Sequence, residues 1–118
     1  SVERRHFLDT ASSDAVLDET LEDYPEVVRG IALELGVPLI DLNAWTRSLY
    51  TGLGRGGSMT LFCHFAPGEH AHWPDGLSDN THFSQKGATL VAGEVARQLA
   101  RLGFGPQVRE LSTTAGRA

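Results

Sequence analysis

The stretch Val37-Pro38-Leu39-Ile40-Asp41-Leu42 decides the fold class of this chain. It is a short apolar run that directly follows Gly36, and such a run is typical of a strand buried in a parallel sheet. Pro38 stands at the second position, which suits the beginning of such a strand rather than its middle. The sequence therefore predicts a buried parallel strand over residues 37–42.

Helical patterns lie on both sides of this predicted strand. Apolar residues recur at helical spacing after Tyr24-Pro25, and Gly36 ends the pattern, which predicts a helix over residues 24–35. Asn43 is expected to cap a second helix that ends at the glycine-rich residues 52–57. Ser84 is expected to cap a last helix that ends at Gly103. Helices around a parallel strand indicate the α/β class.

The number of predicted strands is too small for a sheet. A parallel strand needs neighbours that satisfy its backbone groups and cover its apolar faces. Residues 4–8 and 15–17 are candidates for two short extended pieces around a polar turn, and residues 58–65 fit a helical or an extended piece. Either the first segment supplies more sheet than this, or strands come from another chain.

Composition excludes several classes of function. The chain has 118 residues, 41% of them hydrophobic and 21% charged, which suits one globular domain. Its net charge of −5, with scattered cationic residues, argues against nucleic acid as a partner. No apolar run approaches the roughly 20 residues of a membrane span, and no signal peptide is visible, so a secreted and a cytoplasmic location both stay open. The single cysteine, Cys63, forms no internal disulfide and is expected to be an inert buried thiol.

The sharpest chemical signal is Asp79-Asn80-Thr81-His82, before the last predicted helix. At this spacing a carboxylate can hold an imidazole by a hydrogen bond, fix its tautomer and stabilise the imidazolium. An unperturbed histidine titrates at about 6.5, which suits a general base near neutral pH. The alternative is that Asp79 only accepts hydrogen bonds from backbone N–H groups at the helix start.

Several blocks of the sequence together resemble the C-terminal part of SGNH (GDSL-type) hydrolases. The blocks are Phe65-Ala66-Pro67-Gly68-Glu69-His70, Trp73-Pro74-Asp75-Gly76, Asp79-Asn80-Thr81-His82-Phe83-Ser84 and Gly87-Ala88, with earlier matches at Tyr24-Pro25 and at residues 37–43. They are most similar to rhamnogalacturonan acetylesterase-like carbohydrate esterases, over about residues 1–103. The resemblance implies a three-layer α/β/α, flavodoxin-like fold. It also implies that His82 is the general base and acid, with Asp79 as its orienting partner.

The chain also departs from that family. The nucleophilic serine of a Gly-Asp-Ser block is absent, and so are the glycine and asparagine of the oxyanion hole. The chain is therefore expected to be a partial, C-terminal part of one domain, with mixed structure over 1–20, core elements over 21–103 and a tail over 104–118. Ser58 has glycine neighbours, but no predicted strand precedes it and the Gly-x-Ser-x-Gly pattern is missing, so it is not expected to replace the nucleophile.

The long loop predicted over residues 66–80 carries the candidate substrate contacts. Trp73 is expected to stack on a sugar ring and His70 to hydrogen-bond hydroxyls at the rim of a groove, although Trp73 also fits a loop anchor. Residues 64–82 are rich in histidine, aspartate and glutamate, which are ligands in some metal sites. Their spacing, however, matches no helical His-x-x-x-His site. We expect no metal and no cofactor. Trp45, on a helical apolar face, is expected in the core.

These observations predict part of a serine esterase that acts on acylated carbohydrates or small esters. The chain is expected to be inactive alone and active when the N-terminal half is supplied, for example as a separate chain. The alternative is a non-catalytic fragment that associates with itself or with another chain through its sheet edge. A metal-binding loop protein is a third hypothesis.

Overall fold

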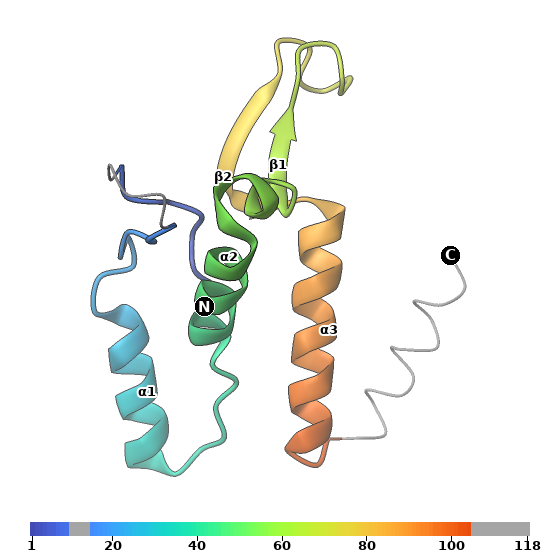
Figure 1. The fold of residues 1–118 in the computed structure, drawn as a ribbon. Helices are drawn as coiled ribbons and strands as arrows, with labels where there is room; N and C mark the ends of the chain where they lie inside the picture. The colour runs from blue at the N-terminus through green and yellow to red at the C-terminus, as the bar shows by residue number, and fades with distance from the viewer. Residues whose placement is uncertain (10–14, 105–118) are drawn as a thin grey trace.

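The computed structural model describes residues 1–9 and 15–104. In chain order its elements are α1 (Tyr24–Leu35), α2 (Leu42–Met59), β1 (Phe62–Phe65), β2 (Leu77–Phe83) and α3 (Gln85–Arg101). The strands form an antiparallel hairpin that projects beyond one end of the helices (Figure 1). The expected mixture of helix and strand is therefore confirmed in this coarse sense.

The first and last predicted helices are confirmed, and local signals explain their ends. Gly36, at φ 63°, ends α1 in the left-handed conformation that glycine adopts without strain. At the start of α3, the Ser84 hydroxyl accepts a hydrogen bond from the Gly87 backbone N–H at 3.2 Å.

Two predictions about α2 are wrong. Its N-cap is Asp41, whose carboxylate accepts a hydrogen bond from the Ala44 N–H at 3.0 Å, and Asn43 lies within the first turn instead. The glycine-rich residues 52–57 do not end the helix either, because only Gly54 leaves helical geometry, at φ 71° and ψ −177°. The helix is interrupted there and continues to Met59, which also resolves the start of the ambiguous 58–65 segment.

The predicted parallel strand over residues 37–42 is also wrong. Residues 37–41 form a non-helical connection between α1 and α2, and they pair with no strand among residues 1–9 and 15–104. The side chain of Val37 remains 50% exposed. An apolar run becomes a parallel strand only where neighbouring strands satisfy its N–H and C=O groups, and the described part of the chain supplies none.

Two extended pieces near the N-terminus are confirmed. Phe7 and Leu17 form an antiparallel bridge, and the Leu8 N–H donates to the Val16 carbonyl at 2.8 Å. Residues 10–14, predicted as the turn between the pieces, lie outside the described residues, as do residues 105–118 of the predicted tail.

The pairing of β1 with β2 contains a wide bulge. Phe62 pairs with Phe83, and His64 pairs with Ser78. One residue, Cys63, therefore separates the two pairs on β1, whereas the four residues 79–82 separate them on β2. The predicted loop over residues 66–80 is accordingly too long, because β2 begins at Leu77. Asp79-Asn80-Thr81-His82 lies in the bulge of a strand rather than in a loop.

The hydrophobic core lies where the N-terminal pieces, α2 and the base of the hairpin meet. Tyr50 and Phe62 pack edge to face with ring centroids 5.3 Å apart, and Phe62 and Phe83 lie 5.2 Å apart. The buried members of this core are Leu17, Tyr50, Leu61 and Phe62. Trp45 and Cys63 were expected to be buried and are only half-buried, because neither is enclosed by this small core.

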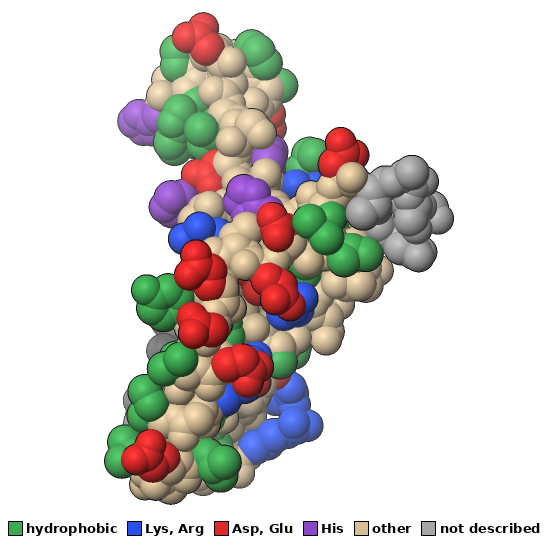
Figure 2. Space-filling view, turned by 90° about the vertical axis from the view of Figure 1, so that its left-hand side faces the viewer, with side chains coloured by type: hydrophobic (Ala, Val, Ile, Leu, Met, Phe, Trp, Pro, Cys, Tyr) green, Lys and Arg blue, Asp and Glu red, His purple; other side chains and the backbone are tan. Residues whose placement is uncertain are grey.

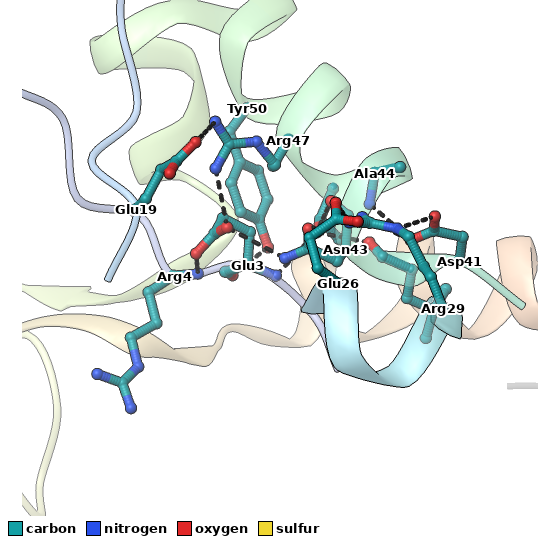
Figure 3. Close-up of polar contacts among 12 residues, drawn as sticks. Glu3, Arg4, Glu19, Glu26, Arg29, Asp41, Asn43, Ala44, Arg47 and Tyr50 are labelled. Atoms are coloured by element: carbon teal, nitrogen blue, oxygen red, sulfur yellow. Dashed lines mark hydrogen bonds and ion pairs between the residues drawn. The ribbon is translucent and has the colours of Figure 1, made fainter. Parts of the chain in front are cut away.

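A polar network holds the N-terminal segment on α2 (Figure 3). Glu3 is 2% exposed, and its carboxylate accepts hydrogen bonds from Arg47 and Asn43, each at 3.1 Å. The Tyr50 hydroxyl donates to the Glu3 carbonyl at 3.1 Å, and burial raises the pKa of Tyr50 to about 12. The N-terminal segment is thus fixed against α2 by its first few residues.

Large apolar surfaces remain uncovered. The radius of gyration is 16.7 Å, against about 13 Å for a compact domain of roughly 100 residues. Figure 2 shows hydrophobic side chains exposed on one face of the molecule. The large hydrophobic residues of α1 that are exposed are Tyr24, Val27, Val28, Ile31, Leu33 and Leu35. The periodicity thus predicted the helix correctly, but its apolar face is covered only in part by the described residues. None of the described helices is long and apolar enough to cross a membrane.

Candidate active site

Asp79 and His82 are in direct contact within the β2 bulge. The Asp79 Oδ2 atom lies 2.7 Å from His82 Nδ1. The other carboxylate oxygen, Oδ1, accepts hydrogen bonds from the backbone N–H groups of Thr81 at 2.7 Å and His82 at 2.9 Å. Both alternatives for Asp79 therefore occur together: one oxygen closes a turn on the backbone, and the other contacts the imidazole.

These hydrogen bonds stabilise the charged form of Asp79. The two backbone N–H groups contribute most and the imidazole of His82 adds to them, so the pKa of Asp79 falls from 3.8 to about 2. The carboxylate is therefore ionised at neutral pH and acts as a fixed acceptor. Its side chain is 23% exposed, whereas that of His82 is 79% exposed.

The geometry gives His82 one engaged and one open nitrogen. Because the Asp79 carboxylate accepts from Nδ1–H, the neutral imidazole carries its lone pair on Nε2. Within the described parts of the chain, Nε2 has no hydrogen-bond partner. This arrangement can take a proton from an approaching hydroxyl group and hold the resulting imidazolium beside a carboxylate. The catalytic role of the pair stays a prediction.

A second polar network lies beside this pair and was missed from the sequence. The Asn80 Oδ1 atom accepts a hydrogen bond from Arg5 Nη1 at 2.8 Å and lies 3.0 Å from His64 Nε2. His64 Nδ1 in turn lies 3.3 Å from the Ser78 hydroxyl. No local signal identifies this set, since Arg5 and Asn80 are 75 positions apart.

His70 and Trp73 form an aromatic cluster on the hairpin. Their ring centroids are 4.7 Å apart, and Phe65 stacks on Trp73 at 5.5 Å with an interplanar angle of 17°. Both His70 and Trp73 line an open groove of about 810 Å³ that runs along β1 to the start of α3. A volume of roughly 300–1,000 Å³ is typical of small-molecule sites.

The structure does not bring the two predicted pairs into one groove. Neither Asp79 nor His82 belongs to the lining of the groove that His70 and Trp73 share. The binding roles predicted for His70 and Trp73 stay predictions.

The histidines between residues 64 and 82 are also candidate metal ligands by their chemistry. Within residues 1–9 and 15–104, no three His, Cys, Asp or Glu side chains converge as a metal site would require. His70 and His72 stack with ring centroids 5.5 Å apart, and the His72 N–H donates to His70 Nδ1 at 3.2 Å. These contacts make them part of the aromatic cluster.

The described serines near the site have structural partners. Ser58 is fully buried, where its hydroxyl accepts from Arg5 Nε at 2.9 Å and donates to the Arg55 carbonyl. Ser84 caps α3 and also donates to the Thr60 carbonyl at 2.9 Å. Neither hydroxyl hydrogen-bonds to His82.

Comparison with known proteins identifies one esterase relative. No family model and no solved structure matches the chain. The chain is 46% identical over 104 residues to rhamnogalacturonan acetylesterase RhgT from Bacillus subtilis (strain 168). The match covers 88% of this chain but 43% of that esterase, so the chain spans less than half of its relative's length. The resemblance predicted from the sequence is confirmed, because this chain is similar to that rhamnogalacturonan acetylesterase over most of its own length.

Proposed function

We propose that this chain contributes Asp79 and His82 to the catalytic triad of an SGNH-type carbohydrate acetylesterase. The observation that carries the proposal is the 2.7 Å contact between the Asp79 carboxylate and His82 Nδ1, which leaves Nε2 open on the surface. The identity of 46% to an acetylesterase supports the same reaction class.

The proposed reaction is acyl transfer through a serine. The serine hydroxyl gives its proton to His82 Nε2 while its oxygen attacks the ester carbonyl carbon. The C–O bond to the sugar then breaks, and the imidazolium gives its proton to the departing sugar oxygen, which leaves as a hydroxyl group. Water, activated by His82 in the same way, hydrolyses the acyl-enzyme to acetic acid and free serine. Asp79 stays ionised throughout and holds the imidazole.

The substrate side of the proposal places part of an acylated carbohydrate in the groove along β1, while the ester group itself lies at His82, outside that groove. Trp73 offers an aromatic face to a sugar ring, and the His70 imidazole can bond to hydroxyl groups. Neither a metal nor a cofactor enters the proposed chemistry. A small acyl ester such as p-nitrophenyl acetate is therefore a sufficient probe.

The serine and the oxyanion donors come, in this proposal, from an N-terminal half that a second polypeptide can supply. Together the parts form a three-layer α/β/α domain of the flavodoxin-like SGNH type. Nucleophile and oxyanion hole account for most of the rate in such enzymes. We therefore expect the chain alone to hydrolyse esters barely above the uncatalysed rate.

An alternative function is non-catalytic association through the sheet edge. The observation that favours it is the hairpin itself, since β2 is the only strand that pairs with β1 in the described part of the chain. An unpaired strand edge can pair with a second copy or with another protein. A stable, inactive homodimer in size-exclusion chromatography would favour this alternative.

The decisive experiment supplies the missing half. The chain is co-expressed with the part of a rhamnogalacturonan acetylesterase that it does not span, and hydrolysis of p-nitrophenyl acetate is measured. We expect activity well above that of either part, and His82→Ala should lower kcat by about 10³-fold or more. His6→Ala, at an exposed histidine outside the pair, is the matched control. No gain on co-expression, or a gain that His82→Ala leaves intact, would reject the proposal.

A further inference from the structure

The Asp79–His82 pair is anchored from outside its own bulge. Asn80 lies between the two residues, and its side-chain oxygen accepts a hydrogen bond from Arg5 Nη1 at 2.8 Å. The Asn80 backbone carbonyl also accepts from the Arg5 N–H at 3.0 Å. Both the backbone and the side chain of Asn80 are therefore held by the same residue of the N-terminal segment.

Arg5 is itself fixed by three further contacts. It is 8% exposed, its Nε donates to the Ser58 hydroxyl at 2.9 Å, and its Nη2 donates to the Arg55 carbonyl. Its guanidinium also lies over the Phe7 ring, 5.5 Å from the centroid. A planar guanidinium with fixed donors orients its acceptors more rigidly than an ammonium group does.

The contacts on Asn80 extend to a second strand. Because Asn80 Oδ1 only accepts, its 3.0 Å contact with His64 is a hydrogen bond from Nε2–H. The amide oxygen thus receives one donor from the N-terminal segment and one from β1. This leaves little freedom for Asn80, whose backbone directly joins Asp79 to Thr81.

We propose that Arg5 is a positioning residue for the Asp79–His82 pair and acts through Asn80. This inference rests on the function proposed above. Asp79 precedes Asn80, and the two N–H groups that bind its carboxylate follow Asn80 at positions 81 and 82. A movement of Asn80 therefore changes the turn that orients the carboxylate and the imidazole toward an external serine. A misplacement of about 1 Å in such a system can cost roughly 10²-fold in rate.

The test compares Arg5→Lys with its neighbour Arg4→Lys in the co-expressed esterase. Lysine keeps the charge but not the forked donors, and the exposed Arg4 side chain provides the matched control. We expect Arg5→Lys to lower kcat by about 10- to 100-fold with KM unchanged, because the acyl-transfer geometry is altered and the substrate contacts are not. Arg4→Lys should leave both constants within twofold.

A second readout uses the chain alone. In Arg5→Lys, the pKa of the Asp79 carboxyl, followed by carbon NMR, should rise from about 2 toward 3.8, because the turn that binds the carboxylate loosens. A loss of stability without a positioning role would lower Tm and leave this pKa in place.

Asn80→Ala keeps the experiment decisive where Arg5→Lys impairs folding. It removes the acceptor and leaves Arg5 bound to Ser58 and Arg55. If Arg5 acts through Asn80, Asn80→Ala should reproduce the fall in kcat, and the double variant should be no slower than the slower single variant. Additive losses, or an Asn80→Ala enzyme as fast as Arg4→Lys, would overturn the inference. If His82→Ala is also without effect, the proposed function fails instead.

Discussion

Replacement of Asp79 by asparagine isolates the charge of the carboxylate from its role in the turn. An asparagine side-chain oxygen can still accept the two backbone N–H bonds from residues 81 and 82. The negative charge beside the His82 imidazole is lost. The variant should therefore keep the hairpin while losing the pH dependence that Asp79 contributes to stability.

The magnitude follows from the lowered pKa of Asp79. That pKa falls from 3.8 to about 2 in the folded chain. A change of one pKa unit corresponds to about 1.4 kcal/mol of folding free energy. Because solvent screens the charge beside an exposed imidazole, we expect Asp79 to contribute only about 1 kcal/mol to the free energy of unfolding. Because the folded pKa is below the unfolded one, this stabilisation is complete above about pH 4 and disappears as the pH falls through 2.

Denaturant unfolding at several pH values between 2 and 7 measures this contribution. We expect the wild-type chain to be more stable than Asp79→Asn by about 1 kcal/mol at pH 7, with the difference shrinking to nearly zero at pH 2. Asp75→Asn, which removes a carboxylate at an exposed position in the hairpin loop, is the matched control. The reasoning would be refuted if the free energies of unfolding of the wild type and of Asp79→Asn, plotted against pH, remained parallel down to pH 2.

Two further predictions concern packing and buried charge. A Cβ atom at Gly87 would lie 2.1 Å from the Leu61 carbonyl oxygen, so Gly87→Ala should destabilise the chain by about 3 kcal/mol or more. The control is Gly93→Ala in the same helix, where a Cβ atom meets nothing within 4 Å. This variant should be neutral or stabilise the chain by up to about 1 kcal/mol. Thermal unfolding of the two variants would contradict this if their Tm values shift equally. Glu3→Ala removes a carboxylate that is 2% exposed and leaves the donors of Asn43 and Arg47 without their shared acceptor, so it should cost about 2 kcal/mol. Glu19→Ala removes the 78% exposed carboxylate that pairs with the same Arg47 at 3.8 Å, and it should cost less than about 0.5 kcal/mol. Equal urea midpoints for the two glutamate variants would contradict the larger contribution to the free energy of unfolding that is expected from the buried Glu3.

The helices were predictable because their determinants are local. Gly36 ends α1 through its own backbone conformation, and Ser84 begins α3 through a bond to a residue three positions on. Asp41 and Asn43 are both good caps, and the sequence offered no means of ranking them. In the structure the Asn43 side chain donates to Glu3, 40 positions away, and accepts from Arg29.

The wrong strand at residues 37–42 has a different origin. Its apolar character was recognised correctly, but a strand also depends on neighbours elsewhere in the chain or outside it. The candidate site divides in the same way. The contact between Asp79 and His82 follows from a spacing of three residues, whereas the role of Arg5 depends on a partner 75 positions away.

The unequal register of the hairpin constrains how this segment can change in length. Phe83 belongs to the core through its contact with Phe62, directly after the four residues 79–82 that bulge out of the ladder. The same four residues contain the turn in which Asp79 binds the N–H groups of Thr81 and His82. A change in the number of residues between positions 79 and 82 would therefore alter the shape of the bulge and the spacing of the acid and the imidazole together.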